Sequence, residues 1–163
     1  IDRIAMVGVV GNLMLWASGH DIGEGNREFI RKSLGEAFEE TWQDSEKLVS
    51  EYQSLLFLPS DLAVEEDGRR KTIGLDDLPT NFPIYDIGID TMMRLRPLIM
   101  EANCLLWNGP ASYFEKSEFA YGTVEIMNMF TEATGVTIVG GGHTSALFNQ
   151  RGKADQVLSL IHI

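Results

Sequence analysis

The chain has 163 residues and carries 13 basic and 24 acidic side chains, which gives a formal net charge of −11. This length fits one domain with its own core, and 44% hydrophobic with 23% charged residues excludes wholesale disorder. The acidic charge argues against a surface that binds nucleic acid or an anionic membrane, because both present phosphates. No run of about 18 apolar residues is present to span a bilayer.

The single cysteine and the two ends of the chain say something about its context. Cys104 cannot form an internal disulfide and suits a reducing compartment, so we expect a cytoplasmic protein. The sequence opens at Ile1 without the features of a signal peptide and closes on the apolar run 158–163. A chain that starts and stops inside apolar segments is expected to be a fragment of a longer protein.

The first half of the chain is expected to alternate short strands with helices. Residues 4–10 form an apolar, β-branched run that predicts a strand, followed by a short helical stretch after Gly11. Asn26 is expected to cap a helix that continues to about Tyr52, because apolar side chains recur there at helical spacing. The remaining elements expected in this half are extended segments at residues 55–59 and 61–64 and a charged, solvated hairpin at residues 65–71.

The second half repeats a strand, turn and helix rhythm. A strand at residues 84–88 precedes a helix that Asp90 and Thr91 are expected to cap, and Pro97 lies inside this helix, which runs to about Ala102. The other expected elements are strands at residues 103–107, 136–142 and 157–163 and helices at residues 123–133 and 143–150. The pattern is typical of an α/β, three-layer Rossmann-like domain with a mostly parallel sheet and helices on both faces, formed by residues 1–163 as a single domain.

Three turns after predicted strands are candidate sites, because ligands of such folds gather beyond the carboxyl ends of the strands. At Gly140, Gly141 and Gly142, before His143 and Thr144, backbone N–H groups can approach an anion at the start of a helix. The same glycines suit a plain tight turn, and the residues alone leave both interpretations open. The turn is neither a Walker A loop, which needs a following lysine, nor a dinucleotide-binding motif, which needs a third, spaced glycine.

The second turn, Asn108-Gly109-Pro110, can place Asn108 against a base or a phosphate, and Glu115 can accept hydrogen bonds from sugar hydroxyls. A plain turn with a solvated glutamate is the alternative. At the third turn, Asp90 and Thr91 fit a simple helix cap, and Gly8 with Gly11 forms only a GxxG fragment that close packing also explains. The histidines and the cysteine lack the spacing of metal ligands, and no nucleophile motif is present.

Several segments together resemble the C-terminal, nucleotide-binding half of phosphoglycerate kinase. They are VVGNLMLWASGHDIG, DIG followed by T, LLWNGPASYFE, FAYGT and TIVGGGHTSAL, in that order and spacing. The resemblance covers essentially the whole chain. It implies reversible phosphoryl transfer in glycolysis from 1,3-bisphosphoglycerate to ADP, giving 3-phosphoglycerate and ATP, with Mg²⁺ accompanying the nucleotide.

The resemblance also implies which residues bind ADP or ATP. The glycine turn contacts the phosphates, Glu115 binds the ribose hydroxyls, and Gly8 lies against the adenine. The full nucleotide-binding set is Gly8, Asn108, Pro110, Glu115, Gly140, Gly141, Gly142, His143 and Thr144. The resemblance implies neither a catalytic residue nor a protein ligand to a metal within these residues.

The sequence departs from the family pattern at several positions. Aspartate is common in the family at the position of His143, whereas some archaeal members have histidine there. Val9 replaces a glycine that usually flanks the adenine, and Ser112-Tyr113 replace Gly-Val. A neutral imidazole is a poor ligand for a hard cation. The lysine of the family's GGAKV segment, its STGGGA loop and its basic, N-terminal substrate-binding domain are expected outside this chain. We therefore expect the fragment alone to be inactive, and a non-catalytic nucleotide-binding or interaction module on the same scaffold is the alternative.

Overall fold

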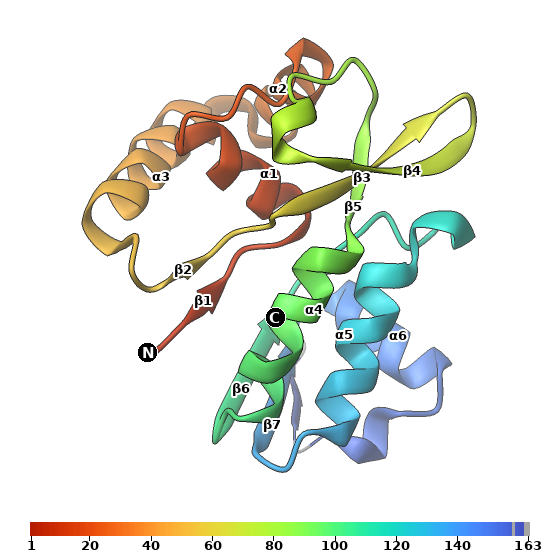
Figure 1. Ribbon diagram of the computed structural model, residues 1–163. Helices are drawn as coiled ribbons and strands as arrows, with labels where there is room; N and C mark the ends of the chain where they lie inside the picture. Colours follow the sequence, from red (N-terminus) through yellow and green to blue (C-terminus); the bar gives the residue numbers. More distant parts are fainter. Residues whose placement is uncertain (158, 162–163) are drawn as a thin grey trace.

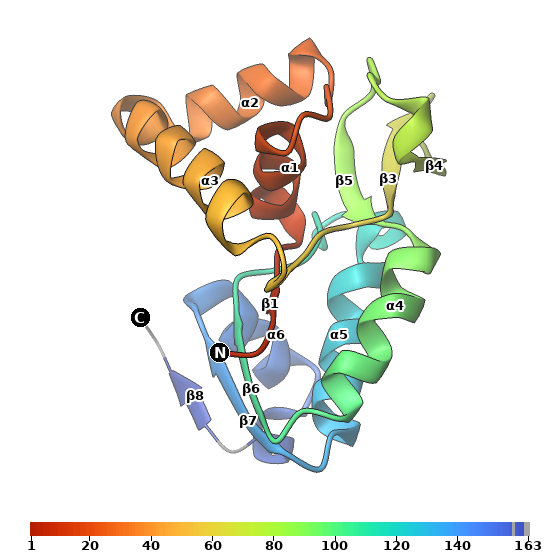
Figure 2. The ribbon, with the colours of Figure 1, turned by 60° about the vertical axis from the view of Figure 1, so that its left-hand side comes forward.

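The computed structural model describes residues 1–157 and 159–161, and its strands form three sheets (Figures 1 and 2). The strands are β1 (Ile4–Ala5), β2 (Leu56–Phe57), β3 (Asp61–Glu66), β4 (Arg69–Gly74), β5 (Ile84–Ile87), β6 (Cys104–Asn108), β7 (Val136–Gly140) and β8 (Ser159–Ile161). β1 pairs with β2 and β7 lies between β6 and β8, all in parallel, while β3 lies antiparallel between β4 and β5. The expected α/β class is confirmed. The expected hairpin is the turn that joins β3 to β4, whereas the sequence did not predict that β5 extends this pair into an antiparallel sheet.

Helices surround the sheets in two groups. They are α1 (Gly8–Ala17), α2 (Glu24–Leu34), α3 (Phe38–Tyr52), α4 (Ile89–Met100), α5 (Tyr121–Glu132) and α6 (Gly142–Gln150), with single 3₁₀ turns η1 (Gly35–Ala37), η2 (Leu75–Asp77), η3 (Ser117–Phe119) and η4 (Ala154–Gln156). The first three helices lie beside the antiparallel sheet, and α4 and α5 run side by side next to β6 and β7 (Figure 2). The candidate turns therefore lie where the two groups meet.

Each group has its own hydrophobic cluster. In the first, Leu13 and Ile30 from α1 and α2 pack with Leu62 and Val64 of β3, all at most 5% exposed. In the second, Trp107 of β6 packs against aromatic side chains of α5 and α6. Burial of apolar surface stabilises each cluster by roughly 25 cal/mol per Å², so both groups of elements have a substantial core.

The strand expected at residues 4–10 is wrong beyond its first residues. Only Ile4 and Ala5 form the strand β1, and α1 begins at Gly8. The first turn of this helix leaves Val9 and Val10 about half exposed, at 48% and 52%. An apolar, β-branched run at an exposed helix start has the same sequence signature as a short buried strand, which explains the error.

The single helix expected from Asn26 to Tyr52 is in fact two helices. The chain turns at Gly35, where φ is 55°, and continues through η1 into α3. The apolar stripe expected there is confirmed, because Phe38 and Trp42 stack against Trp16 of α1 at ring-centroid distances of 5.9 and 4.3 Å.

Both expected side-chain caps are wrong. Asn26 lies inside α2, where its amide fixes the helix to a neighbouring segment. Asp90 and Thr91 lie inside α4 and receive the cap from another strand: the carboxylate of Asp61 accepts hydrogen bonds from their backbone N–H groups at 3.0 and 2.7 Å. A cap supplied by a residue some 30 positions away leaves no local sequence signature.

The elements expected in the second half are confirmed with small shifts at their ends. β6 extends to Asn108, β7 ends at Gly140, and α5 and α6 begin at Tyr121 and Gly142. The final strand is observed at Ser159–Ile161; Val157 precedes it, next to η4, and the expected positions 158, 162 and 163 lie outside the described residues. Among the described helices, none is long and apolar enough to cross a membrane.

Candidate functional site

The carboxyl ends of β6 and β7 bring two of the predicted turns into contact. Asn108 pairs in register with Gly140, so the Asn-Gly-Pro turn and the glycine turn leave the sheet side by side. Gly141 has a φ of 87°, and a Cβ there would lie 2.9 Å from the Oδ1 of Asn108. The glycine is therefore required both by the backbone conformation and by the close approach of the asparagine.

A third segment, from the beginning of the chain, joins these turns. Gly8 starts α1 with a φ of 63°, and a Cβ at this position would lie 2.6 Å from the carbonyl oxygen of Pro110. The N-terminal end of α1 thus packs directly on the Asn-Gly-Pro turn. A separate hydrogen bond fixes the loop after the turn to α5: Ala111 N–H donates to the buried hydroxyl of Thr123 at 3.1 Å.

A cavity of about 840 Å³ opens beside this junction. Four of the residues expected to bind nucleotide line it: Gly8, Pro110, Glu115 and His143. The others, Asn108, Gly140, Gly141, Gly142 and Thr144, are grouped behind or beside them in the two turns and are not part of its lining. The cavity has the size that small-molecule sites typically have.

The cavity also includes residues that sequence reasoning did not single out as site residues. Asn12 of α1, Phe29 of α2 and Tyr85 of β5 line it, as does Val9, which was noted only as a departure from the family. A signal was available for Phe29: it lies off the apolar stripe of its helix and is 59% exposed. Single exposed apolar side chains are, however, common on protein surfaces, so exposure alone does not mark a functional residue.

Helix starts differ in how their N–H groups are satisfied. Asp86 accepts hydrogen bonds from Gly122 N–H at the start of α5 and from Arg70 at 2.6 Å. Burial raises the pKa of the Asp86 carboxyl, against the opposing effects of these two donors. By contrast, no side chain in the described part of the molecule caps α1 or α6, whose first turns hold Gly8 and His143 of the cavity.

The first turn of α6 also contains hydroxyls without protein partners. Among the described residues, the buried Oγ1 of Thr144 and Oγ of Ser145 have no hydrogen-bond partner, and neither does the indole N–H of Trp107. Buried polar groups are normally paired, so unpaired ones at a helix start are compatible with a site that is completed by a ligand or by further polypeptide.

Lys116, the residue after Glu115, anchors the loop that carries both of them. Lys116 Nζ lies 2.6 and 2.8 Å from the two carboxylate oxygens of Glu65 and 5.1 Å from the ring centroid of Tyr85. The hydrogen bond to Glu65 raises the pKa of Lys116. Glu115 itself is exposed and makes no hydrogen bond or ion pair with any described residue, so its carboxylate is open to a ligand.

No group of three or more histidine, cysteine, aspartate or glutamate side chains in the described part of the chain could hold a metal ion. The acidic side chains that line the cavity are Asp86, which is paired with Arg70, and Glu115. The donor set does not form a resident Mg²⁺ site. A magnesium ion in this cavity would therefore have to be carried by the phosphates of a ligand.

Comparisons with known proteins agree along the whole chain. The family profile described as phosphoglycerate kinase matches residues 1–163. Phosphoglycerate kinases of Methanopyrus kandleri and Methanobacterium bryantii are 31% and 35% identical over 96% and 93% of this chain. The solved phosphoglycerate kinases from Pyrococcus horikoshii OT3 and Coxiella burnetii superpose with TM-scores of 0.86 and 0.80 at 30% and 26% identity, each over 98% of the chain.

The match concerns only part of these proteins. The chain spans 38% and 36% of the two curated relatives and 40% and 41% of the two solved chains. Within that portion the agreement extends from the first strand to the last, in sequence and in fold. The chain belongs to the phosphoglycerate kinase family.

Proposed function

We propose that this chain is the nucleotide-binding part of a phosphoglycerate kinase and that it binds ADP or ATP in the cavity beside β6 and β7. In the complete enzyme a phosphoryl group moves reversibly from the acyl phosphate of 1,3-bisphosphoglycerate to a terminal oxygen of ADP, leaving 3-phosphoglycerate. Because the chain spans well under half of its relatives, the substrate-binding half is the proposed partner, and the chain by itself is proposed to be inactive.

The observation that carries the proposal is the meeting of three distant segments at one cavity. The start of α1, the Asn-Gly-Pro turn and the glycine turn before α6 touch one another through Gly8, Pro110, Asn108 and Gly141. Both helices present N-termini without side-chain caps, and each carries a partial positive charge. Such ends favour phosphate groups, which the acidic remainder of the chain would repel.

We assign the individual roles from the resemblance to the family, and the chemistry and position of the residues support them. The backbone N–H groups around Gly140–Gly142, with His143 and Thr144, face the phosphates; the open carboxylate of Glu115 accepts hydrogen bonds from the ribose hydroxyls. Pro110 lines the cavity between them, and Asn108 lies beside it, against the glycine turn. Catalysis of phosphoryl transfer consists mostly of positioning and charge neutralisation, and these residues supply the positioning.

Charge neutralisation has to come from elsewhere. The cavity holds no resident metal site, so Mg²⁺ enters as the magnesium complex of the nucleotide, and basic groups come from the other half of the protein. We expect the enzyme to act in the cytoplasm, where an exposed free thiol such as Cys104 stays reduced.

A non-catalytic nucleotide-binding module is the second candidate, and the presence of His143 in the cavity, where aspartate is common in the family, favours it. The two candidates differ in the segments that flank the chain in the parent protein. An intact GGAK segment before it and an intact STGGGA segment after it would support the kinase, and degenerate segments would support the module.

The direct test is a calorimetric titration of the folded chain with ADP, with and without Mg²⁺, repeated on Glu115→Ala. The proposal predicts binding that weakens in the variant, because one carboxylate partner of the ribose is lost. Absence of binding by a chain with native circular dichroism would contradict an independent nucleotide site within these residues.

A further inference from the structure

The loop that carries Glu115, residues 111–120, lies on one face of the antiparallel sheet. The opposite face is apolar: Leu62 and Val64 of β3 and Ile73 of β4 belong to the cluster that the sheet shares with α1 and α2. Side chains alternate between the two faces of a strand, so the residues between these point toward the loop. On that side η3 packs against β4, just before α5 begins (Figure 1).

Two charged side chains connect this second face of the sheet to the loop. Glu65 and Arg70 are register partners on β3 and β4, so they project from the same face. The guanidinium of Arg70 lies 5.9 Å from the ring centroid of Phe119 in η3. The carboxylate of Glu65 accepts from Lys116 Nζ at 2.6 and 2.8 Å. The sheet therefore holds the loop at two points.

Glu115 lies in a turn, residues 113–116, whose two ends are both fixed to the sheet. A hydrogen bond of 3.1 Å from Lys116 N–H to the carbonyl of Tyr113 closes the turn. At its first residue, Tyr113 N–H donates to the carbonyl of Tyr85 in β5 at 2.7 Å. At its last residue, Lys116 is paired with Glu65 of β3. Between these anchors, Glu115 lines the cavity.

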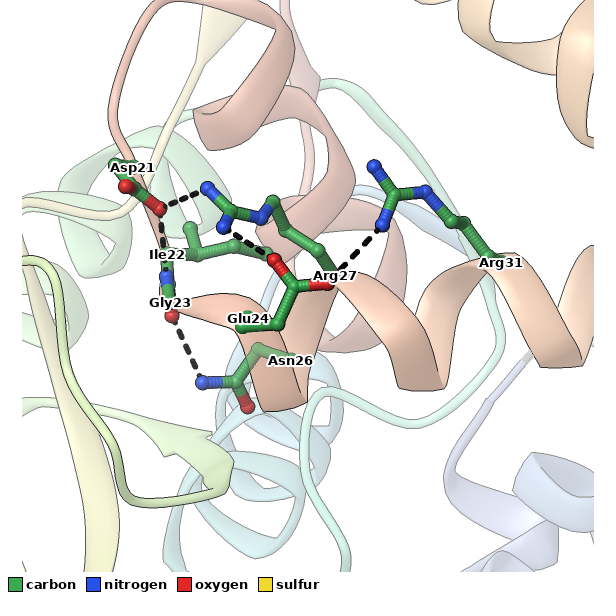
Figure 3. A network of polar contacts seen from close by, with 7 residues as sticks. All are labelled: Asp21, Ile22, Gly23, Glu24, Asn26, Arg27 and Arg31. Carbon is green, nitrogen blue, oxygen red and sulfur yellow. Dashed lines mark hydrogen bonds and ion pairs between the residues drawn. The ribbon is translucent and has the colours of Figure 1, made fainter.

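The Glu65–Lys116 ion pair differs from ion pairs that link neighbours within one helix. Figure 3 shows the local kind, in which Arg27 lies between the carboxylates of Asp21 and Glu24 at the start of α2. Lys116 and Glu65 are 51 residues apart, and the Glu65 side chain is only 20% exposed. A partly buried pair is screened less by salt than an exposed one, and this pair ties the loop to another part of the fold.

We propose that Glu65 and Lys116 are positioning residues, whose ion pair holds the 113–116 turn so that the carboxylate of Glu115 meets the ribose hydroxyls of a bound nucleotide. This inference rests on the proposed function. Neither Glu65 nor Lys116 lines the cavity, so the pair acts through Glu115. It orders the turn before a ligand arrives, which lowers the cost of binding. It also keeps the ammonium of Lys116 away from the adjacent carboxylate, which stays free to accept hydrogen bonds.

The test is a calorimetric titration of the 163-residue chain with ADP and with 2′,3′-dideoxy-ADP, which lacks both ribose hydroxyls. The two ligands carry the same charge, so the ratio of their affinities reports the ribose contact without the general electrostatic effect of a substitution. Glu65→Gln and Lys116→Met each break the ion pair, and each should lower the preference for ADP about threefold. Neither should lower it further in a Glu115→Ala background. Lys116→Arg keeps the pair and should retain the preference.

Glu66→Gln is the matched control. Glu66 is the next residue on β3 and pairs with Lys71 at 2.6 Å, within the same hairpin and outside the loop. Its loss should leave the preference for ADP unchanged. Circular dichroism verifies that each variant is folded.

The possible outcomes separate this inference from the proposed function. A preference for ADP that Glu115→Ala lowers, but Glu65→Gln and Lys116→Met do not, would overturn the positioning inference alone. So would an equal loss of affinity for both ligands, which indicates a general structural role. A preference that Glu115→Ala leaves unchanged would overturn the ribose contact and this inference with it. A folded wild-type chain that binds no ADP would overturn both the inference and the proposed function.

Discussion

The helix starts in the described part of the chain include two kinds. Some are capped by a buried carboxylate and have a structural role, and others have no side-chain cap and lie at the candidate site. α4 and α5 begin under buried carboxylates, Asp61 and Asp86, which accept hydrogen bonds from their first N–H groups. α1 and α6 begin at Gly8 and Gly142 with no side-chain cap, and both open toward the cavity.

The difference teaches where an anion can bind. A carboxylate at a helix start satisfies its N–H groups and cancels its partial positive charge, so the site is closed to a phosphate. A helix start made of glycine and left uncapped keeps both the donors and the charge for a ligand. Mutations at the capped starts should lower the stability of the fold, whereas mutations at the uncapped starts should change ligand binding.

The largest expected effect breaks the cap of α5. Asp86→Ala removes the acceptor of the Gly122 N–H and the charged partner of the partly buried guanidinium of Arg70, which retains only the carbonyl of Ile87 as an acceptor. We expect a loss of about 3 kcal/mol in the free energy of unfolding. Urea unfolding followed by circular dichroism measures it. Asp86→Asn retains an acceptor for Gly122 and should lose less, and a loss below about 1 kcal/mol for the alanine variant would contradict the assigned role.

The cap of α4 comes next. Asp61→Ala removes the acceptor of the Asp90 and Thr91 N–H groups and one of the two acceptors of the Thr91 hydroxyl, which lies 2.6 Å from the carboxylate and 3.0 Å from the backbone carbonyl of Asp61. We expect a loss of about 2 kcal/mol, measured by the same unfolding experiment. Asp90→Ala, at an exposed side chain in the same turn, is the control and should change stability by less than about 0.5 kcal/mol.

At the uncapped start of α1, Gly8→Ala can be compared with Gly19→Ala. Both glycines have positive φ, but a Cβ at Gly8 would meet the carbonyl oxygen of Pro110, whereas a Cβ at Gly19 would meet nothing within 4 Å. Both variants suffer backbone strain, and Gly8→Ala should lose about 1 kcal/mol more. It alone should weaken ADP binding in a titration, since it separates α1 from the Asn-Gly-Pro turn. Equal affinity for ADP in both variants would argue against a role for this junction in binding.

At the uncapped start of α6, His143→Asp adds a carboxylate like those at the starts of α4 and α5. The helix dipole should raise the free energy of unfolding by about 0.5 kcal/mol. Metal-free ADP should bind about threefold more weakly because the carboxylate repels phosphates, and Mg²⁺ should reduce this loss because a carboxylate ligates it. His143→Asn provides the uncharged control. Unchanged binding of metal-free ADP to His143→Asp would place the phosphates away from α6.

The smallest effect concerns an exposed cap. The N–H of Gly23, and further the guanidinium of Arg27, hold the pKa of Asp21 below its usual value of 3.8. Because the pKa of Asp21 is lower in the native state, its carboxylate stabilises the native state at pH values above the pKa of the unfolded state. This contribution is lost as the pH falls through the pKa of the native state. The stability difference between wild type and Asp21→Asn should therefore narrow below about pH 4 in urea titrations at pH 7, 5 and 3. Asp44→Asn is the control, and a difference that is constant with pH would contradict the prediction.

The second half of the fold was predictable because its signals are local. Strands such as residues 103–107 end in glycine or proline turns, and each following helix has its own apolar spacing. The first half was less predictable, because Gly8 starts a helix inside an apolar run and Gly35 divides two helices that share one apolar stripe. The pairing of β3 with β5 is also non-local, and no short sequence pattern encodes it.

For the site, the turns were predictable and the walls were not. The glycine turn and the Asn-Gly-Pro turn are recognisable from their glycine and proline residues alone. The resemblance to a known family assigned Gly8 and Glu115 to the nucleotide site. Asn12 and Phe29 come from helices whose orientation is set by tertiary contacts such as those of Asn26, so their position beside the cavity depends on the folded chain.

The placement of the tryptophans makes the chain its own fluorescent reporter. Trp107 is 6% exposed directly before the Asn-Gly-Pro turn, while Trp16 and Trp42 lie 4.3 Å apart in the other helix group. Replacing Trp16 and Trp42 by phenylalanine would leave Trp107 as the single tryptophan, in the core beside the Asn-Gly-Pro turn. Its emission, blue-shifted by burial in the native state, would follow unfolding of that half and the arrival of a nucleotide without any attached dye.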